Sequence, residues 1–466
     1  MSDDRSTSEA KLRARRAALG LGSASGPSAS SRSAAAMPVS AAEDLLSEAP
    51  ADAALRDKAM FICFAVIAIS ATFLQCFGIP LGSTDTIGAL ILAVVPLAFL
   101  SMCFYVRPII DPVRLGLFVL LVAAAMIGTA ATANRYSSGS LALFIVLYIP
   151  FIVAFPVSES TWRRCLNFFV TIMIVIAGVE FLQHAIQLTA GRASLPNLYK
   201  IVPQGWMIPD YNYMQPIVWQ SPYIKPQAFV FLEASMLSQY LALALCIEVA
   251  LFQRVWRIVV LVAAVFGTFA GTGLLLLVFA LPVLLGRMSM RNMILIALAI
   301  LVVAAVAANA GWLDTVSHRF NEFGKSGRSA NHRFVEPLDR IVALFGSPAS
   351  FYSGIGAGQI EKTDNHQFWP IAKAMVEYGL LTGILFYAFL IRAMFARPPM
   401  RALAFTLLLW FSFEGSLLTA VNPLTCVFLS SMFVIDRTER RSGGRGQAAQ
   451  SDQMSEARSP AMTRAA

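Results

Sequence analysis

Long runs of apolar residues recur along most of this chain, and they constrain its fold more than any other feature of the sequence. A stretch such as "AMFICFAVIAISATFLQCF" is apolar on every face and long enough to cross the roughly 30 Å hydrocarbon core of a bilayer as a helix. The chain is 57% hydrophobic and only 14% charged, which excludes an ordinary water-soluble domain. We therefore predict an all-α polytopic membrane protein.

The apolar runs divide into about twelve predicted transmembrane helices, given the length that a bilayer requires. Their predicted starts lie near Ala59, Thr86, Arg114, Leu141, Leu166, Phe229, Trp256, Gly273, Asn292, Phe368, Ala402 and Val421. The break at "TFAGTG" (268–273) divides one long apolar stretch into a hairpin. Without this break, the alternation of loop charges described next would fail.

Lysine and arginine are concentrated in every second short loop, as in the Arg163–Arg164 and Arg287–Arg291 regions. The alternate short loops, such as "GIPLGSTD", carry almost none. The positive-inside rule then predicts that both termini are cytoplasmic. We expect residues 1–57 and 437–466 to be disordered cytoplasmic tails around a transmembrane domain at 58–436. The net charge of +9 follows from this loop pattern, so we predict no nucleic-acid partner.

Two long polar loops, at about 190–225 and 312–366, are predicted to face the periplasm. Both exceed the usual length of a connector, and aromatic residues such as Trp206 and Trp219 favour order over disorder. In the second loop, "RFVEPLDRIVALF" has the apolar pattern of a short helix. We therefore expect a functional surface on the outer side.

The cysteines and histidines indicate neither a disulfide framework nor a metal site. All six cysteines lie in or beside apolar runs, where small packing side chains are common. The chain has no Asp-x-Asp and no His-x-x-x-His, and "GIGAG" (354–358) lacks the Lys-Ser/Thr of a phosphate-binding loop. We predict no metal and no cofactor.

The second loop carries a cluster of arginines, including Arg319, Arg328 and Arg333. The planar guanidinium donates two parallel hydrogen bonds to anionic oxygens, so this loop is suited to a phosphate group. A solvated basic surface is the plain alternative.

Several ionisable side chains lie in or beside the apolar segments, where burying a charge is costly. Lys373 and Glu377 are four residues apart on the tenth segment, hence on one helix face, and the alternative to a functional pair is a structural ion pair. Glu233 lies near the start of the sixth segment, and its alternative is a helix-terminal carboxylate at the interface. Glu180 and Glu414 also lie toward the outer side.

In order along the chain, these segments resemble the O-antigen polymerase and ligase superfamily (Wzy-like proteins). The resemblance spans roughly 220–390 and rests on "KPQAFVFLEASMLSQYLA", "GTG", "SGRSANHRF", "GIGAG", "DNHQFW" and "EYGLLTG". Lys225 stands where the family usually has arginine, and Asn365–His366 reverses the commoner order. "FLEAS" is closer to the polymerase form than to the ligase form.

The resemblance implies a GT-C-like glycosyltransferase of the bacterial inner membrane. Its donor is a glycan on undecaprenyl diphosphate, and its acceptor is a lipid-linked repeat unit. It implies an inverting reaction without metal or nucleotide, and pathway partners that include a chain-length regulator and a flippase. The implied roles are His366 or Glu233 as base, diphosphate binding by Lys225, Arg328 and Arg333, and support from the residues Arg319, Asp364, Lys373 and Glu377.

Three alternatives remain open from the sequence. A ligase that moves finished glycan to a lipid A core or protein would differ only in acceptor. A twelve-span transporter or flippase is disfavoured because the sixth-to-seventh connection is only "QRVWR" and no internal repeat is visible. A non-catalytic membrane scaffold is the third. The polymer itself is an O antigen, a capsule or an exopolysaccharide.

Overall fold

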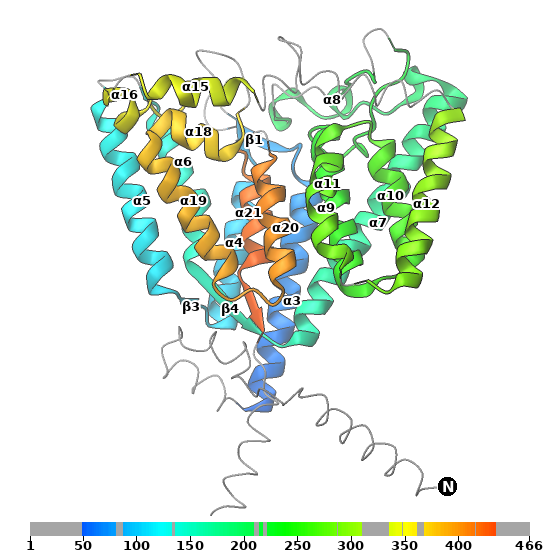
Figure 1. The fold of residues 1–466 in the computed structure, drawn as a ribbon, viewed down its shortest axis with the longest axis horizontal. Coiled ribbons are helices and arrows are strands. Elements are labelled where there is room, and N and C mark those ends of the chain that lie inside the picture. The colour runs from blue at the N-terminus through cyan, green and yellow to red at the C-terminus, as the bar shows by residue number, and fades with distance from the viewer. Residues whose placement is uncertain are drawn as a thin grey trace, which may run out of the picture. The chain divides into compact units, whose positions relative to one another are not determined.

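The fold is a bundle of α-helices with two small groups of short strands (Figure 1). The computed structural model describes residues 49–80, 87–132, 136–208, 214–217, 221–286, 288–309, 335–346, 348–360, 368–414 and 416–434. The candidate residues Arg319, Arg328, Arg333, Asp364 and His366 lie outside these ranges.

The described helices form three groups that pack side by side (Figure 1). The middle group consists of α3 (Pro50–Phe73), α4 (Ile91–Val106), α20 (Arg401–Ser412) and α21 (Val421–Ser430). On one side of it lie α5 (Pro112–Ala131), α6 (Ser138–Tyr148) with the 3-10 turn η2 (Ile149–Ile152), α16 (Pro348–Ser353), α18 (Pro370–Tyr378) and α19 (Leu380–Phe395). On the other side lie α7 (Glu159–Ala190), α9 (Ala234–Ile247) with the π-helical turn η5 (Glu248–Phe252), α10 (Val255–Gly267), α11 (Gly271–Leu285) and α12 (Met290–Asn309).

The two ends of the bundle differ (Figure 1). One end, which we call the loop end, carries several short elements. These are η3 (Arg192–Ser194), α8 (Leu198–Ile201), η4 (Gln204–Trp206), α15 (Glu336–Leu344) and the hairpin of β1 (Gly78–Pro80) and β2 (Ile87–Ala89). At the opposite end, the sheet end, lie β3 (Ile109–Ile110), β4 (Val153–Val157) and β5 (Met432–Val434). Strand β4 pairs antiparallel with β3 and parallel with β5. The expectation of an all-α chain omitted these short strands.

Each predicted apolar segment contains an α-helix, and the predicted hairpin is present: α10 ends at Gly267 and α11 begins at Gly271. Helix α3 begins at Pro50, ahead of the predicted domain boundary at 58. By length and composition, the described helices Pro112–Ala131, Glu159–Ala190 and Ala234–Phe252 can cross a membrane, and several further apolar helices, α4 and α19 among them, have 10–17 residues. The count of about twelve spans and the periplasmic placement of the loops remain predictions.

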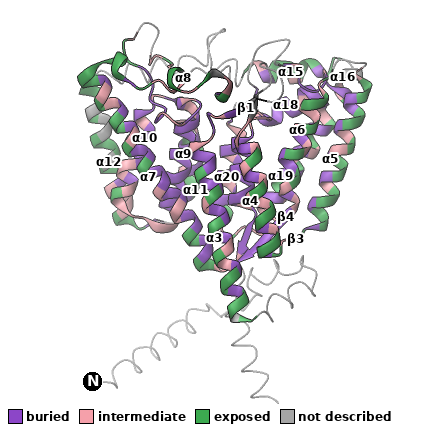
Figure 2. Cartoon of the chain, turned by 180° about the vertical axis from the view of Figure 1, so that it is seen from behind, coloured by how far each residue is buried: buried purple, intermediate pink, exposed green. Residues whose placement is uncertain are grey.

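Figure 2 shows exposed residues along the outer faces of the helices, and many of the exposed residues are large and apolar. The side chain of Phe104 on α4 is 83% exposed and that of Ile127 on α5 is 71% exposed. In water, so many exposed apolar side chains would drive aggregation, whereas hydrocarbon solvates them. The surface is therefore that of a membrane protein.

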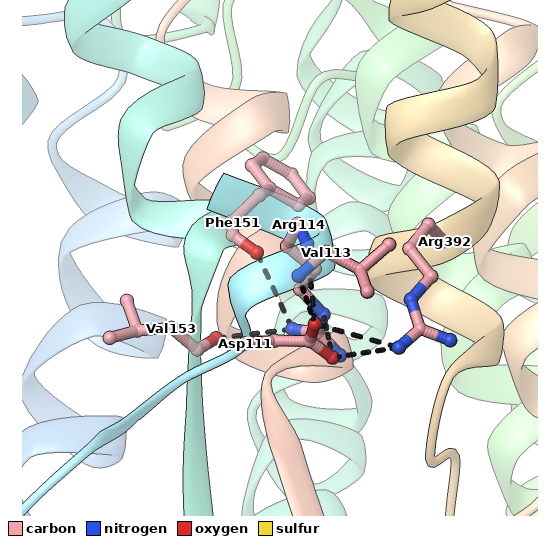
Figure 3. A network of polar contacts seen from close by, with 6 residues as sticks. All are labelled: Asp111, Val113, Arg114, Phe151, Val153 and Arg392. Atoms are coloured by element: carbon pink, nitrogen blue, oxygen red, sulfur yellow. Dashed lines mark hydrogen bonds and ion pairs between the residues drawn. The ribbon is translucent and has the colours of Figure 1, made fainter. Parts of the chain in front are cut away.

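A polar clamp joins three segments at the sheet end (Figure 3). Asp111 caps α5 by accepting hydrogen bonds from the backbone N–H groups of Val113 and Arg114, and Arg392 of α19 donates to its Oδ2 over 3.1 Å. Arg114 in turn donates to the backbone carbonyls of Phe151 and Val153, which links α5 to η2 and β4.

The charge state of Asp111 depends on this clamp. Burial by itself raises the pKa of this carboxyl, but the backbone donors and the Arg392 and Arg114 guanidinium groups together bring it below its ordinary value. The clamp therefore holds a carboxylate.

Candidate functional site

The chain from Ile224 to Leu232 runs to the first turn of α9 as buried, irregular backbone. Lys225 is only 6% exposed, and its backbone N–H donates to the carbonyl of Gln215 over 2.8 Å. Ala228 and Phe229 have φ of 52° and 61°, in the left-handed region that side chains other than glycine rarely adopt. The sixth helix was expected to start near Phe229, but α9 begins at Ala234 because these two residues interrupt the helical path.

Glu233 is the residue just before α9, so its carboxylate lies at a helix terminus. It is half-buried, and its Oε2 accepts a hydrogen bond from Ser235 Oγ over 2.8 Å. A carboxylate at this position interacts favourably with the positive end of the helix dipole. Oxygen Oε1 takes no part in that bond.

The "GTG" motif packs the start of α11 tightly against the first turns of α9, which follow Glu233 in the chain. Thr272 Oγ1 donates to the carbonyl of Ser235 over 3.0 Å. A Cβ added at Gly273 would lie 2.1 Å from Ser238 Oγ, so only glycine allows this approach. The motif therefore acts in helix packing and in the placement of the α9 terminus.

Lys373 and Glu377 lie together on α18, with Lys373 Nζ 3.9 Å from Glu377 Oε1. Their side chains are 2% and 0% exposed, so the pair is buried and ionic. Both residues were expected on one long tenth span, which is wrong in detail. The chain breaks at Gly379, where φ is 91°, and α18 is a separate helix from α19.

The "GIGAG" turn encloses the C-terminal end of α18. The N–H groups of Ile355 and Gly356 donate to the last carbonyls of α18, those of Val376 and Glu377, over 2.9 and 3.0 Å. A Cβ at Gly354 would lie within 2.6 Å of that same backbone. The turn thus satisfies carbonyls that a helix end otherwise leaves open.

Glu377 also holds the chain that leaves this turn. Its Oε1 accepts a hydrogen bond from the backbone N–H of Ile360 over 3.2 Å. Phe368, on the other side of 361–367, packs with Ile360, Val376 and Leu344 in a small buried cluster. Ile360 and Phe368, the described residues on either side of 361–367, therefore both contact α18.

A further acidic residue, Glu180 of α7, is completely buried. Its Oε1 lies 3.9 Å from Nε2 of His184, which bonds to the carbonyl of Gly267 over 2.9 Å. Because a carbonyl only accepts, Nε2 of His184 carries a proton. A Cβ at Gly267 would lie 2.6 Å from Glu180 Oε1, so this glycine makes room for the carboxyl group.

The sequence interpretation missed three glutamines. Gln75, Gln183 and Gln187 are buried, and each bonds to the backbone between Ile224 and Leu232. Amide side chains in otherwise apolar segments were the available signal, because a polar group buried in a membrane bundle needs a partner.

The structure brings Lys373 together with Glu377 and Glu233 together with Ser235. Helix α18, which carries the first pair, lies toward the loop end (Figure 1). Within the described ranges, no cluster of three or more His, Cys, Asp or Glu side chains could hold a metal ion.

Helical architecture, three helices long and apolar enough to cross a bilayer, and an apolar surface define a membrane protein, and its buried charged side chains include Lys373 and Glu377 on α18. The chain belongs to the WcaD colanic acid polymerase family, whose match covers residues 63–364. No curated protein and no solved structure is significantly similar to it.

Family membership confirms the resemblance to Wzy-like polysaccharide polymerases. The chain is thus related to glycosyltransferase-type polymerases of exopolysaccharide assembly. The matched region includes Lys225, Glu233, Arg328 and Arg333 and ends just before His366.

Proposed function

We propose that this protein is a polysaccharide polymerase at the periplasmic face of the bacterial inner membrane. It transfers a glycan from undecaprenyl diphosphate to a hydroxyl group of a second lipid-linked repeat unit. Family membership supports the polymerase class. In this proposal the loop end faces the periplasm, both termini are cytoplasmic, and the site draws on both long loops.

The leaving diphosphate requires positive charge, because negative charge develops on its oxygen as the bond to the anomeric carbon breaks. Lys225, Arg328 and Arg333 supply this charge in the proposed site, and Arg319 supports them. Guanidinium groups suit the task since they donate paired hydrogen bonds to phosphate oxygens. No metal ion and no nucleotide are required, because the donor's sugar–diphosphate bond already provides the driving force.

The acceptor hydroxyl must lose its proton as its oxygen bonds to the anomeric carbon. His366 takes that proton in the proposed mechanism, because neutral imidazole is available near pH 7. Glu233 is the alternative base or orients the acceptor. One displacement forms one carbon–oxygen bond and breaks one, so the anomeric configuration inverts.

The contacts of Ile360 and Phe368, which flank 361–367, are the observation that most supports His366 as the base. The backbone N–H of Ile360 donates a hydrogen bond to Glu377 Oε1, and the side chain of Phe368 packs with Ile360 against the same helix. Lys373, Glu377 and Asp364 therefore act as supports in this proposal, and Lys373 with Glu377 does so from the buried side.

The lipid-linked glycans of a deletion strain test the proposed activity. Loss of a polymerase leaves single repeat units on the carrier lipid. Accumulation of long chains on the carrier would instead indicate a ligase. Repeat units confined to the cytoplasmic leaflet would indicate a transporter.

Single substitutions test the proposed residues. Arg328→Ala, Arg333→Ala and His366→Ala should each abolish long polymer while membrane levels of the protein stay normal. Arg192→Ala is the matched control, because Arg192 is an exposed loop-end arginine outside the proposed site. A normal polymer ladder from all three variants would contradict the proposed roles.

A further inference from the structure

The buried segment Ile224–Leu232 is held only in part by its own backbone, in which the N–H of Val230 donates to the carbonyl of Ala228 over 2.8 Å and that of Phe231 to Gln227 over 3.2 Å. A helix extended toward the N-terminus from α9 would satisfy its backbone N–H groups internally. The observed chain is irregular, and Ala228 and Phe229 take left-handed conformations that are unfavourable for residues other than glycine. Something outside the segment must therefore hold it in place.

Three glutamines from distant parts of the sequence supply that restraint. Gln183 Oε1 accepts from the backbone N–H groups of Gln227 and Ala228 over 3.2 and 3.0 Å. Gln187 accepts from the N–H of Ile224 over 2.8 Å and donates to its carbonyl over 3.2 Å. Gln75, which follows α3, accepts from the N–H of Leu232 over 3.3 Å.

The hydrogen bonds with the glutamines lie at both ends and at the centre of the segment. Gln187 binds the residue just before Lys225, and Gln75 binds the residue just before Glu233. Gln183 holds the strained centre. The two ends carry the charged side chains assigned above to diphosphate and to acceptor.

We propose that Gln75, Gln183 and Gln187 are positioning residues that hold Ile224–Leu232 in its irregular form and so set Lys225 and Glu233 for glycosyl transfer. This inference rests on the proposed function. The glutamines touch only backbone of the segment, so their effect on the reaction is indirect.

The chemistry of the glutamines makes a discriminating test possible. Gln183 serves the segment only as an acceptor, so Gln183→Glu keeps both bonds, whereas Gln183→Leu removes them. Gln187 both donates and accepts at Ile224. Gln187→Glu therefore loses the donor and sets a carboxylate oxygen against a carbonyl.

Cys76 is a built-in reporter of the segment's position. Its Sγ donates to the carbonyl of Val230 over 3.1 Å, and the residue is fully buried. Burial keeps this thiol away from an aqueous reagent while the segment is in place. Displacement of the segment exposes the thiol.

The experiment uses the full-length chain in its native membrane, with the other five cysteines replaced by alanine. The rate of N-ethylmaleimide labelling at Cys76 and the length of the polymer are measured together. Gln183→Leu and Gln187→Glu should speed labelling by about tenfold, the change expected for loss of one or two hydrogen bonds. Both variants should also shorten the polymer, and Gln183→Glu should match the parent in both measurements.

Two results would overturn the inference. Unchanged labelling in Gln183→Leu would show that the glutamine does not hold the segment. Faster labelling with normal polymer would show that the segment's position does not matter to transfer. Lys225→Ala and Glu233→Ala test the proposed function separately: normal polymer from both would count against those roles, whatever the labelling shows.

Discussion

The carboxylate of Glu377 accepts a hydrogen bond from the backbone N–H of Ile360 over 3.2 Å while the same oxygen lies 3.9 Å from Lys373 Nζ. One buried side chain thus connects an ion pair within α18 to the chain that leaves the "GIGAG" turn. The ion pair with Lys373 and the hydrogen bond from Ile360 can therefore be tested separately by substituting Glu377.

We expect Glu377→Gln to keep the bond to Ile360 and to lose only the ionic interaction. Glu377→Ala should lose both and leave a buried ammonium group without this carboxylate, a change that costs about 3 kcal/mol in other buried pairs. Thermal unfolding in detergent and polymer length measure the two effects. Equal behaviour of the Gln and Ala variants would contradict the assignment of the Ile360 bond.

The glycines of "GTG" should differ sharply in their tolerance of alanine. A Cβ at Gly273 would clash with Ser238 at 2.1 Å, whereas a Cβ at Gly271 would meet no atom within 4 Å. Gly273→Ala should therefore lower the free energy of unfolding by about 1–3 kcal/mol, as overpacking usually does. Gly271→Ala is the matched control and should unfold like the parent in the same thermal assay.

The sheet-end clamp should make stability depend on acid pH. The pKa of Asp111 lies below its ordinary value in the folded chain. Its contribution to the free energy of unfolding is therefore fully present above pH 3.8, the ordinary pKa of this carboxyl. That contribution is lost as pH falls through the folded pKa. Asp111→Asn should therefore melt below the parent at pH 7, and the gap in Tm should close toward pH 3. A gap that stays constant over this range would contradict the carboxylate's role.

The two ends of α7 test the proposed orientation of the bundle. Ser194, just beyond its C-terminal end, and Glu159, at its first turn, are both exposed. In a chain lacking the native cysteines, Ser194→Cys should react with an impermeant maleimide at the periplasmic face of intact cells. Glu159→Cys should react only after the membrane is opened. The reverse pattern would refute the topology.

His184 should be replaceable by a side chain that keeps its donor. Nε2 donates to the carbonyl of Gly267, and the amide nitrogen of Gln can do the same. His184→Gln should therefore retain most of the thermal stability that His184→Leu loses, because the leucine leaves a buried carbonyl unsatisfied. If both variants unfold at one temperature, the bond to Gly267 is not structural.

Local patterns were enough to predict several parts of the fold. The apolar segments indicated where helices form, and the glycines at 268–273 indicated the α10–α11 hairpin. The apolar pattern of "RFVEPLDRIVALF" predicted a short helix, and α15 occupies Glu336–Leu344. Each of these features depends on residues that are neighbours along the chain, so sequence spacing carries the information.

The late start of α9, the separation of α18 from α19 and the role of "GIGAG" as a helix cap were not predicted. Each depends on a partner distant in sequence: Gln183 for Ala228, Tyr352 for Gly379, and Val376 for Ile355. A pattern of apolar residues does not specify which backbone groups will meet.

The sequence by itself determined that this chain is a helical membrane protein with a Wzy-like order of motifs, because apolar length, loop charge and motif order are written along one chain. The tertiary structure alone decided that Glu233 precedes its helix, that Glu377 restrains Ile360, and that glutamines hold the Lys225 segment. The physical reason is that a buried polar group must find a partner within the fold, and its identity depends on how the helices pack.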